Sequence, residues 1–81
     1  MSARSWSDDD GVHLDVRGLS PPEPFVAIVR WIEAAAPGSV LIVHLDRDPL
    51  PLYSELTERG WRADRLAGDV GEVRLRLSCD G

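Results

Sequence analysis

The sequence has little that supports covalent or metal chemistry. Its 81 residues include no lysine and a single cysteine, Cys79. Without lysine the chain has neither a Schiff-base amine nor the lysine of a phosphate-binding P-loop. One cysteine can form neither an internal disulfide nor a zinc centre of several thiolates. Lysine-based covalent catalysis and cysteine-rich metal centres are therefore excluded.

Positive charge and long apolar runs are also scarce. Nine basic residues, all of them arginine, stand against 14 acidic ones, and the formal net charge is -5. Such an acidic chain disfavours a broad nucleic-acid-binding surface. No segment approaches the roughly 18–20 apolar residues of a membrane helix, and residues 1–11 lack the apolar core of a secretory signal. We expect a cytoplasmic protein without nucleic-acid or membrane partners, and the use of arginine alone fits a GC-rich bacterial genome.

The length allows one small domain. Residues 1–11, MSARSWSDDDG, are polar and show no periodicity, which predicts a disordered, mobile N-terminal tail with Trp6 as its only large apolar residue. The domain itself is expected over 12–78, and 79–81 form a short C-terminal end.

The hydrophobic pattern of the body predicts four strands and two helices. Alternating residues indicate strands with one exposed face, and apolar residues at helical spacing indicate helices packed on one side. A nearly continuous apolar run indicates a strand covered on both faces. The expected elements are a strand over 12–16, a helix over 22–36, a strand over 40–45, a helix from 49 that ends at Gly60, and strands over 61–66 and 72–77.

The order β-α-β-α-β-β predicts an α+β fold, a two-layer sandwich. The first two strands are expected to be parallel with a right-handed crossover, and the last two form an antiparallel hairpin. Two helices cover only one face of the resulting four-stranded mixed sheet. The other face is expected to be solvated or to form a weak homodimer, so the chain is a monomer or a weak dimer. The residues predicted to lie on this open face are His13, Asp15, Glu72, Arg74 and Arg76.

Both predicted helices begin with a Pro-x-Pro sequence. Proline lacks an N–H group and is tolerated in the first helical turn, where N–H groups have no intrahelical acceptor. Pro22 and Pro24 fit the first and third positions of the first helix. In the second helix Pro49 and Pro51 take the same positions, and Asp48 is expected to be the cap.

The loops before these helices, 17–23 and 46–49, follow two parallel strands, and ligands favour this end of a sheet. Their prolines remove backbone donors and their charges are mixed, which disfavours a phosphate site. The loops better suit a cation, an arginine-bearing partner or a self-paired charge cluster, and we expect Arg17 to pair with Asp46. Ser20 lacks the surroundings of a catalytic nucleophile, and we expect no enzyme. The candidate binding residues are Asp15, Arg17, Ser20, Glu23, Asp46 and Asp48.

The sequence LDVRGLSPPEP at 14–24 resembles the TusA/SirA-like sulfur-carrier family, whose signature is LD-x-x-G-x-x-C-P-x-P. The resemblance covers 12–78. The signature positions that match are Leu14, Asp15, Gly18, Pro22 and Pro24, whereas the cysteine position holds Pro21. The second segment, DRDPLPLY at 46–53, looks more like an uncharacterised bacterial sister group that lacks the cysteine. Members of that group often carry a histidine where this chain has Arg47.

The resemblance implies a sulfur-carrier fold without the carrier thiol, since Pro21 cannot hold a persulfide. We expect a non-catalytic binding or protein-interaction domain, without a cofactor, in redox, sulfur or metal metabolism. Its partner would be an unknown protein or a small ligand. A sulfur carrier that uses Cys79 or a partner's cysteine is the alternative. A second alternative is a weak metal site of His13 and His44 with Asp15, although two histidines without fixed spacing favour ordinary hydrogen-bonded side chains.

Overall fold

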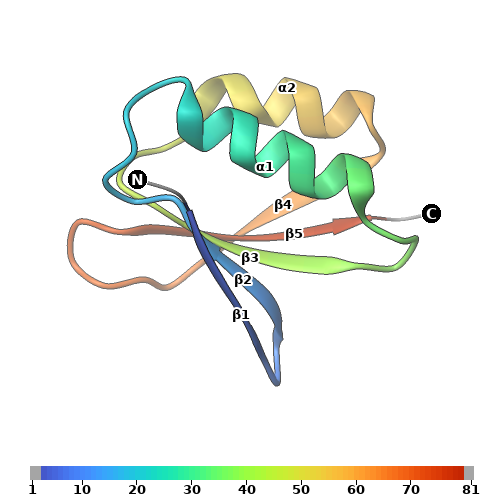
Figure 1. Ribbon diagram of the computed structural model, residues 1–81, viewed down its shortest axis with the longest axis horizontal. Coiled ribbons are helices and arrows are strands. Elements are labelled where there is room, and N and C mark those ends of the chain that lie inside the picture. Colours follow the sequence, from blue (N-terminus) through green and yellow to red (C-terminus); the bar gives the residue numbers. More distant parts are fainter. Residues whose placement is uncertain (1–2, 80–81) are drawn as a thin grey trace.

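The computed structural model describes residues 3–79. Two helices lie side by side on one face of a five-stranded sheet with the order β1-β2-β3-β5-β4 (Figure 1). The elements are β1 (Arg4–Asp8), β2 (Gly11–Asp15), α1 (Glu23–Ala34), β3 (Val40–Leu45), α2 (Leu50–Glu58), β4 (Trp61–Leu66) and β5 (Val73–Cys79). No helix among the described residues is long and apolar enough to cross a membrane.

The predicted α+β class and the two helices on one face are confirmed. Strands β2 and β3 are parallel, and β5 is antiparallel to both β3 and β4. The predicted number of four strands is wrong, because residues 4–8 of the expected tail form β1, which pairs antiparallel with β2. Residues 1–2 of that tail and residues 80–81 of the expected C-terminal end lie outside the described residues.

Strand β1 escapes prediction because every one of its residues is exposed, so burial imposes no apolar pattern on it. Its pairing runs from Arg4 opposite Asp15 to Asp8 opposite Gly11, which leaves a two-residue turn. Gly11 has a φ of 131°, a conformation that residues with a Cβ rarely adopt. The tip of this hairpin points away from the helices (Figure 1).

The hydrophobic core fills the space between the sheet and the helices. Alternate residues of β5 (Val73, Leu75 and Leu77) face the helices, as the period of a strand requires. Helix α1 contributes Ile28 and Ile32, and α2 contributes the equally buried pair Leu52 and Leu56. At the edge of this core Trp31 meets Trp61 edge to face, with ring centroids 6.3 Å apart.

Both helices begin one residue later than their prolines predict. Helix α1 begins at Glu23 and α2 at Leu50, so Pro22 and Pro49 are the caps and no side chain caps either helix. The predicted capping role of Asp48 is therefore wrong. The Pro-x-Pro logic still holds, since each second proline falls in the first turn, where its missing N–H leaves no hydrogen bond unmade.

Candidate functional site

The two loops that precede the helices lie side by side, as the parallel arrangement of β2 and β3 predicts. The backbone N–H of Gly18 donates a hydrogen bond of 2.7 Å to Oδ2 of Asp46. Next to this contact, the N–H of Val16 donates to the carbonyl oxygen of His44 at 3.0 Å. The first loop turns at Gly18, where φ is 83°. The side chain of Asp46 thus ties the two loops together, next to a backbone bond between the ends of the strands that precede them.

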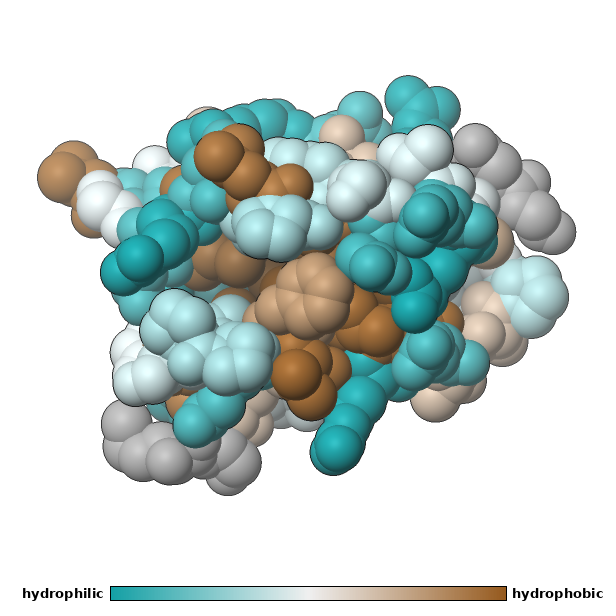
Figure 2. Space-filling view, turned by 90° about the horizontal axis from the view of Figure 1, so that it is seen from above, coloured by the Kyte–Doolittle hydropathy of each residue, from teal (hydrophilic) through white to brown (hydrophobic). Residues whose placement is uncertain are grey.

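A cavity of about 160 Å³ opens between these loops and the first turns of the helices. Its floor is made of buried side chains from the core, among them Ile28, Leu45 and Leu52. The rim is charged, since residues 46–48 also line the cavity. Seen from the helix side, apolar side chains gather between the two helices and hydrophilic ones surround them (Figure 2). The cavity combines an apolar floor with two carboxylates and one guanidinium. We call it the loop pocket.

Arg17 does not pair with Asp46, so that prediction is wrong. Its Nε and one terminal nitrogen donate to the two carboxylate oxygens of Asp15 at 3.0 and 2.9 Å. These hydrogen bonds lower the pKa of the buried Asp15 to about 2. The other terminal nitrogen of Arg17 lies 3.5 Å from Glu72. Arg17 therefore joins the first loop to the open face of the sheet and leaves Asp46 to bond the backbone.

The remaining predicted residues have separate roles. Asp48 accepts a hydrogen bond from the hydroxyl of Tyr53, and burial together with this bond raises the pKa of Tyr53 to about 12. Ser20 is exposed and uses its carbonyl oxygen to accept from the backbone N–H of Glu23 at 2.9 Å. The exposed Glu23 is the first residue of α1 and does not line the loop pocket. The structure thus brings Asp46 and Asp48 to the loop pocket, and places the other four beside it or on the open face.

A second polar cluster lies on the open face, where sequence reasoning named its histidines but not their contacts. His13 and His44 are both buried, and Nδ1 of His13 lies 2.8 Å from Nε2 of His44. Nε2 of His13 bonds Oδ1 of Asp10 at 2.7 Å, and Nδ1 of His44 bonds Oε2 of Glu72 at 2.8 Å. A continuous chain, Asp10–His13–His44–Glu72, therefore runs from the β1–β2 turn across β2 and β3 to the residue before β5. We call it the histidine chain.

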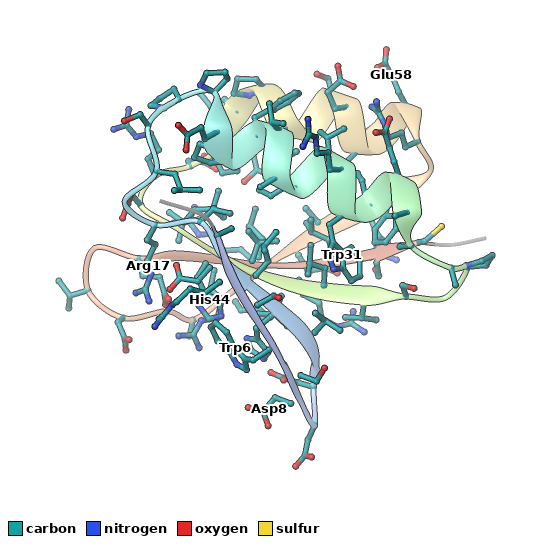
Figure 3. All side chains as sticks on the ribbon, in the orientation of Figure 1. Trp6, Asp8, Arg17, Trp31, His44 and Glu58 are labelled. Atoms are coloured by element: carbon teal, nitrogen blue, oxygen red, sulfur yellow. The ribbon has the colours of Figure 1, made fainter. Side chains whose placement is uncertain are left out.

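Trp6 covers the histidine chain from outside. Its ring stacks on His13 with centroids 5.1 Å apart and on His44 at 5.4 Å. Figure 3 shows Trp6 and His44 together on the side of the sheet opposite the helices, with Arg17 nearby. Trp6 lies directly opposite His13 in the β1–β2 pairing. The segment predicted to be a mobile tail thus contributes Trp6, which shields both imidazoles from one side.

The hydrogen bonds of the histidine chain determine how many hydrogens the ring nitrogens of His13 and His44 must carry. Ionised carboxylates only accept hydrogen bonds, so the outer nitrogens, Nε2 of His13 and Nδ1 of His44, must both carry hydrogen. The contact between Nδ1 of His13 and Nε2 of His44 needs one more hydrogen, carried by either nitrogen. All three bonds form only when the two rings share three protons, which makes one of them an imidazolium. The chain is therefore built around one extra positive charge between two carboxylates.

Glu72 is the fixed end of this chain, and its side chain is 2% exposed. Burial alone would raise its pKa, but the hydrogen bond from His44, the backbone N–H of Asp69 and the guanidinium of Arg74 together lower the pKa to about 2. Arg17 also lies close to the same carboxylate. Glu72 is held ionised, which makes it a strong acceptor for His44.

Cys79 lies far from both sites. It ends β5 opposite Trp61, whereas Val73 at the other end of β5 pairs with Leu45 beside the loop pocket. At about 3.3 Å for each residue of a strand, Cys79 is on the order of 20 Å from that end of the sheet. The thiol therefore has no geometric relation to the loop pocket.

The fold and these sites define a small two-layer α+β domain with an apolar pocket on one side of its sheet and a buried polar chain on the other. The chain belongs to the DUF2249 family, described as an uncharacterised conserved protein, whose model matches residues 13–78. The predicted membership of an uncharacterised family is thereby confirmed, whereas the relation to TusA/SirA-like carriers stays a prediction. No curated protein matches the sequence.

Proposed function

We propose that the chain is a non-catalytic binding module whose loop pocket holds an apolar side chain of a partner protein next to a positive charge. The observation that carries the proposal is the cavity between the two helix-start loops, with its apolar floor and acidic rim. In this reading the protein is a cytoplasmic relative of the TusA-like carriers without their thiol. Its partners belong to redox, sulfur or metal metabolism, where the resemblance points.

The pocket is suited to one anchoring side chain. A volume of about 160 Å³ is that of a single large aliphatic or aromatic residue rather than of a drug-sized ligand. Ile28 and Leu52 in its floor have no exposed surface, so the floor is part of the packed core. The partly buried Leu19 and Phe25 also line the pocket and offer surface to a partner. Rigid apolar pockets of this kind are where single anchor residues contribute most to protein binding.

The rim favours a cation beside that anchor. Asp46 and Asp48 outnumber Arg47, and the whole chain has a net charge of -5. Asp46 uses only Oδ2 for Gly18, and Asp48 uses only Oδ1 for Tyr53. Each carboxylate therefore keeps an oxygen that can accept from an arginine or lysine of the partner. Opposite charges also speed the encounter of the two proteins.

Catalysis at the pocket finds no support among the described residues. Ser20 is the serine of the first loop, and a serine needs an adjacent base to react. His13 and His44 bond each other and two carboxylates on the open face of the sheet, so neither activates Ser20. Binding is the chemistry that the residues around the pocket perform.

The proposal is tested by titrating isotope-labelled protein with capped Leu-Arg and Leu-Glu dipeptides and following the backbone amide signals by NMR. We expect Leu-Arg to shift Gly18 and Leu52 and Leu-Glu to shift them much less. Asp48→Asn keeps an oxygen for Tyr53 but removes the charge, and we expect about tenfold weaker Leu-Arg binding. Asp64→Asn, on the open side of β4, is the matched control. Equal binding of both peptides, or equal effects of both variants, would contradict the proposal.

A further inference from the structure

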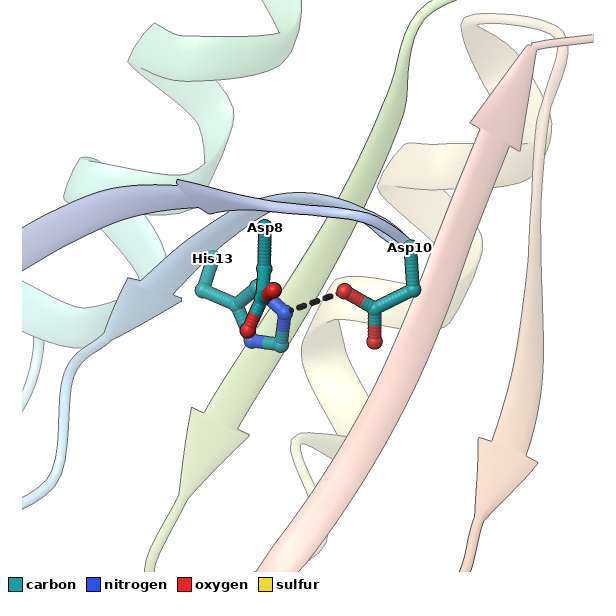
Figure 4. Close-up of side chains that lie close together, drawn as sticks. All are labelled: Asp8, Asp10 and His13. Atoms are coloured by element: carbon teal, nitrogen blue, oxygen red, sulfur yellow. Dashed lines mark hydrogen bonds and ion pairs between the residues drawn. The ribbon is translucent and has the colours of Figure 1, made fainter.

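We propose that the β1–β2 hairpin binds a divalent transition-metal ion through Asp8, Asp10 and Nε2 of His13. The ligand atoms of these three side chains all lie within 4.8 Å of one another. Figure 4 shows the two carboxylates and the imidazole pointing toward one another at the tip of the hairpin. This site lies on the face of the sheet opposite the loop pocket, so it is independent of the proposed binding function.

The hairpin geometry explains why these three residues converge. Trp6 pairs with His13, and Asp8 is two residues beyond Trp6, so Asp8 and His13 project from the same face. Asp10 sits in the two-residue turn and reaches Nε2 of His13 at 2.7 Å. Neighbouring ligands of an ion with bonds of about 2.1 Å are roughly 3 Å apart. To bind an ion, Asp10 and His13 must move slightly apart, and the carboxylate of Asp8 must lie at a similar distance from both.

The buried part of the histidine chain supplies the second observation. Metal-binding histidines almost always donate their other ring N–H to a fixed acceptor, which sets the ring's orientation. With a metal on Nε2, the Nδ1–H of His13 donates to His44, and the Nδ1–H of His44 donates to Glu72. Both rings are then neutral and every ring nitrogen has a partner. The metal takes the place of the proton that otherwise joins Asp10 to His13.

Glu72, the inner end of the histidine chain, is held in place more firmly than a carboxylate in a surface ion pair. Glu72 accepts from Arg74 at 2.8 Å and from the backbone N–H of Asp69 at 3.0 Å, and its side chain is almost fully buried. Trp6 stacks on both imidazoles and excludes water from one side. The outer carboxylates, in contrast, are exposed, so an ion has access to them.

The donor set selects the class of metal. One imidazole nitrogen with two carboxylates suits Zn²⁺, Ni²⁺ or Co²⁺, whereas Ca²⁺ and Mg²⁺ favour sites made only of oxygen. Three protein ligands leave at least one coordination position for water or an added ligand.

The experiment is a calorimetric titration of the full chain with Zn²⁺, and a parallel titration with Ni²⁺ followed by tryptophan fluorescence, because Trp6 lies against His13. We expect one Zn²⁺ per chain and quenching by Ni²⁺ that is lost in Trp6→Phe. Asp10→Asn and Asp8→Asn should each weaken Zn²⁺ binding by about tenfold or more, while Asp9→Asn, which removes the same charge from the same turn, should change it less than about twofold.

His13→Gln and His44→Gln distinguish the metal ligand, His13, from the residue that orients it, His44. His13→Gln should abolish specific binding, and His44→Gln should weaken it by about 10–100-fold, the range for residues that orient a metal ligand. Because these residues are buried, NMR of the imidazole nitrogens in the unchanged protein is the second measurement. Zn²⁺ should convert His13 to the form with hydrogen on Nδ1. Absence of binding at about 1 mM Zn²⁺, equal effects of Asp9→Asn and Asp10→Asn, or an unchanged His13 signal would overturn the proposal.

Discussion

The two faces of the sheet are ordered by different forces. On β5, Leu75 and Leu77 face the helices and are almost completely buried, whereas Arg74 and Arg76 alternate with them on the other side. The helix side is held by apolar burial, which depends on the area removed from water. The open side is stabilised by charged and neutral hydrogen bonds, whose strength depends on which atoms carry the hydrogens. One strand therefore carries two kinds of stability.

The open face is not a simple solvated surface. Ile42 lies on it, opposite His13 on β2 and Arg76 on β5, and yet is 1% exposed. His13 and His44 are buried on the same side without any helix over them. Trp6, which stacks on both imidazoles, provides part of the cover. The domain, whose described residues form two helices on one face of the sheet, thus builds a second, polar core on the other face.

The largest effect is expected on the helix side. Leu77→Ala removes a side chain with no exposed surface and leaves a cavity in the core. The free energy of unfolding should fall by about 2–5 kcal/mol, measured by urea denaturation. Val70→Ala is the control, because Val70 is fully exposed and should change stability by less than about 0.5 kcal/mol. Similar effects of the two changes would mean that the helices do not pack as described.

Removing the charge of Glu72 should have the next largest effect. Glu72→Gln keeps the shape of the side chain but weakens its bonds to Arg74 and His44. We expect the free energy of unfolding to fall by about 2 kcal/mol near neutral pH, because buried charged partners lose their acceptor. Glu58→Gln, at an exposed position on α2, is the matched control. An unchanged stability in Glu72→Gln would show that the open face contributes no second core.

Acid should act on the open face before the helix side. The pKa of Glu72 is about 2 in the folded state, against an ordinary value of 4.5, so the unfolded chain binds the proton first. The stabilisation is complete above about pH 4.5 and is lost as the pH falls through 2. Unfolding of the unchanged protein and of Glu72→Gln at a series of pH values measures it. Their difference should shrink toward pH 2, and a constant difference would contradict the role of the ionised carboxylate.

The smallest effect is expected at the edge strand. Trp6→Ala removes the ring that stacks on both histidines but is itself 39% exposed. The expected loss of stability is about 1 kcal/mol, together with faster hydrogen exchange of the β1–β2 amides. Leu50→Ala, at a residue 70% exposed, provides the comparison for an apolar side chain without this stack. Exchange rates that do not change would show that Trp6 does not secure β1.

The helix side could be predicted from the sequence because burial imposes a period on it. The alternation over 72–77 and the stripes of both helices are direct records of contact with the core. The loops could be placed side by side because parallel strands deliver their carboxyl ends to the same edge. The predicted partner of Arg17 was wrong because Asp15, two residues away, offered a nearer acceptor than Asp46.

The contacts of the open face could not be predicted because they leave no periodic hydrophobic pattern in the sequence. The strand over 40–45 is apolar on both sides, so its sequence does not show that His44 shares a face with His13. Alternation over 72–77 predicts that Glu72 lies on this face, but its bond to His44 depends on the register of the folded sheet. The exposed β1 gave no apolar signal at all. Contacts set by geometry rather than by burial need the structure.

The binding role of the loop pocket is tested most directly by intermolecular NOEs between labelled protein and an unlabelled, capped Leu-Arg dipeptide. The peptide's methyl groups should give NOEs to the side chains of Leu19 and Phe25, which line the pocket and are only partly buried. No NOEs should reach the rings of Trp6 or His13 on the other face. Contacts only with the open face, or none at saturating peptide, would contradict the assignment of the pocket as the binding site.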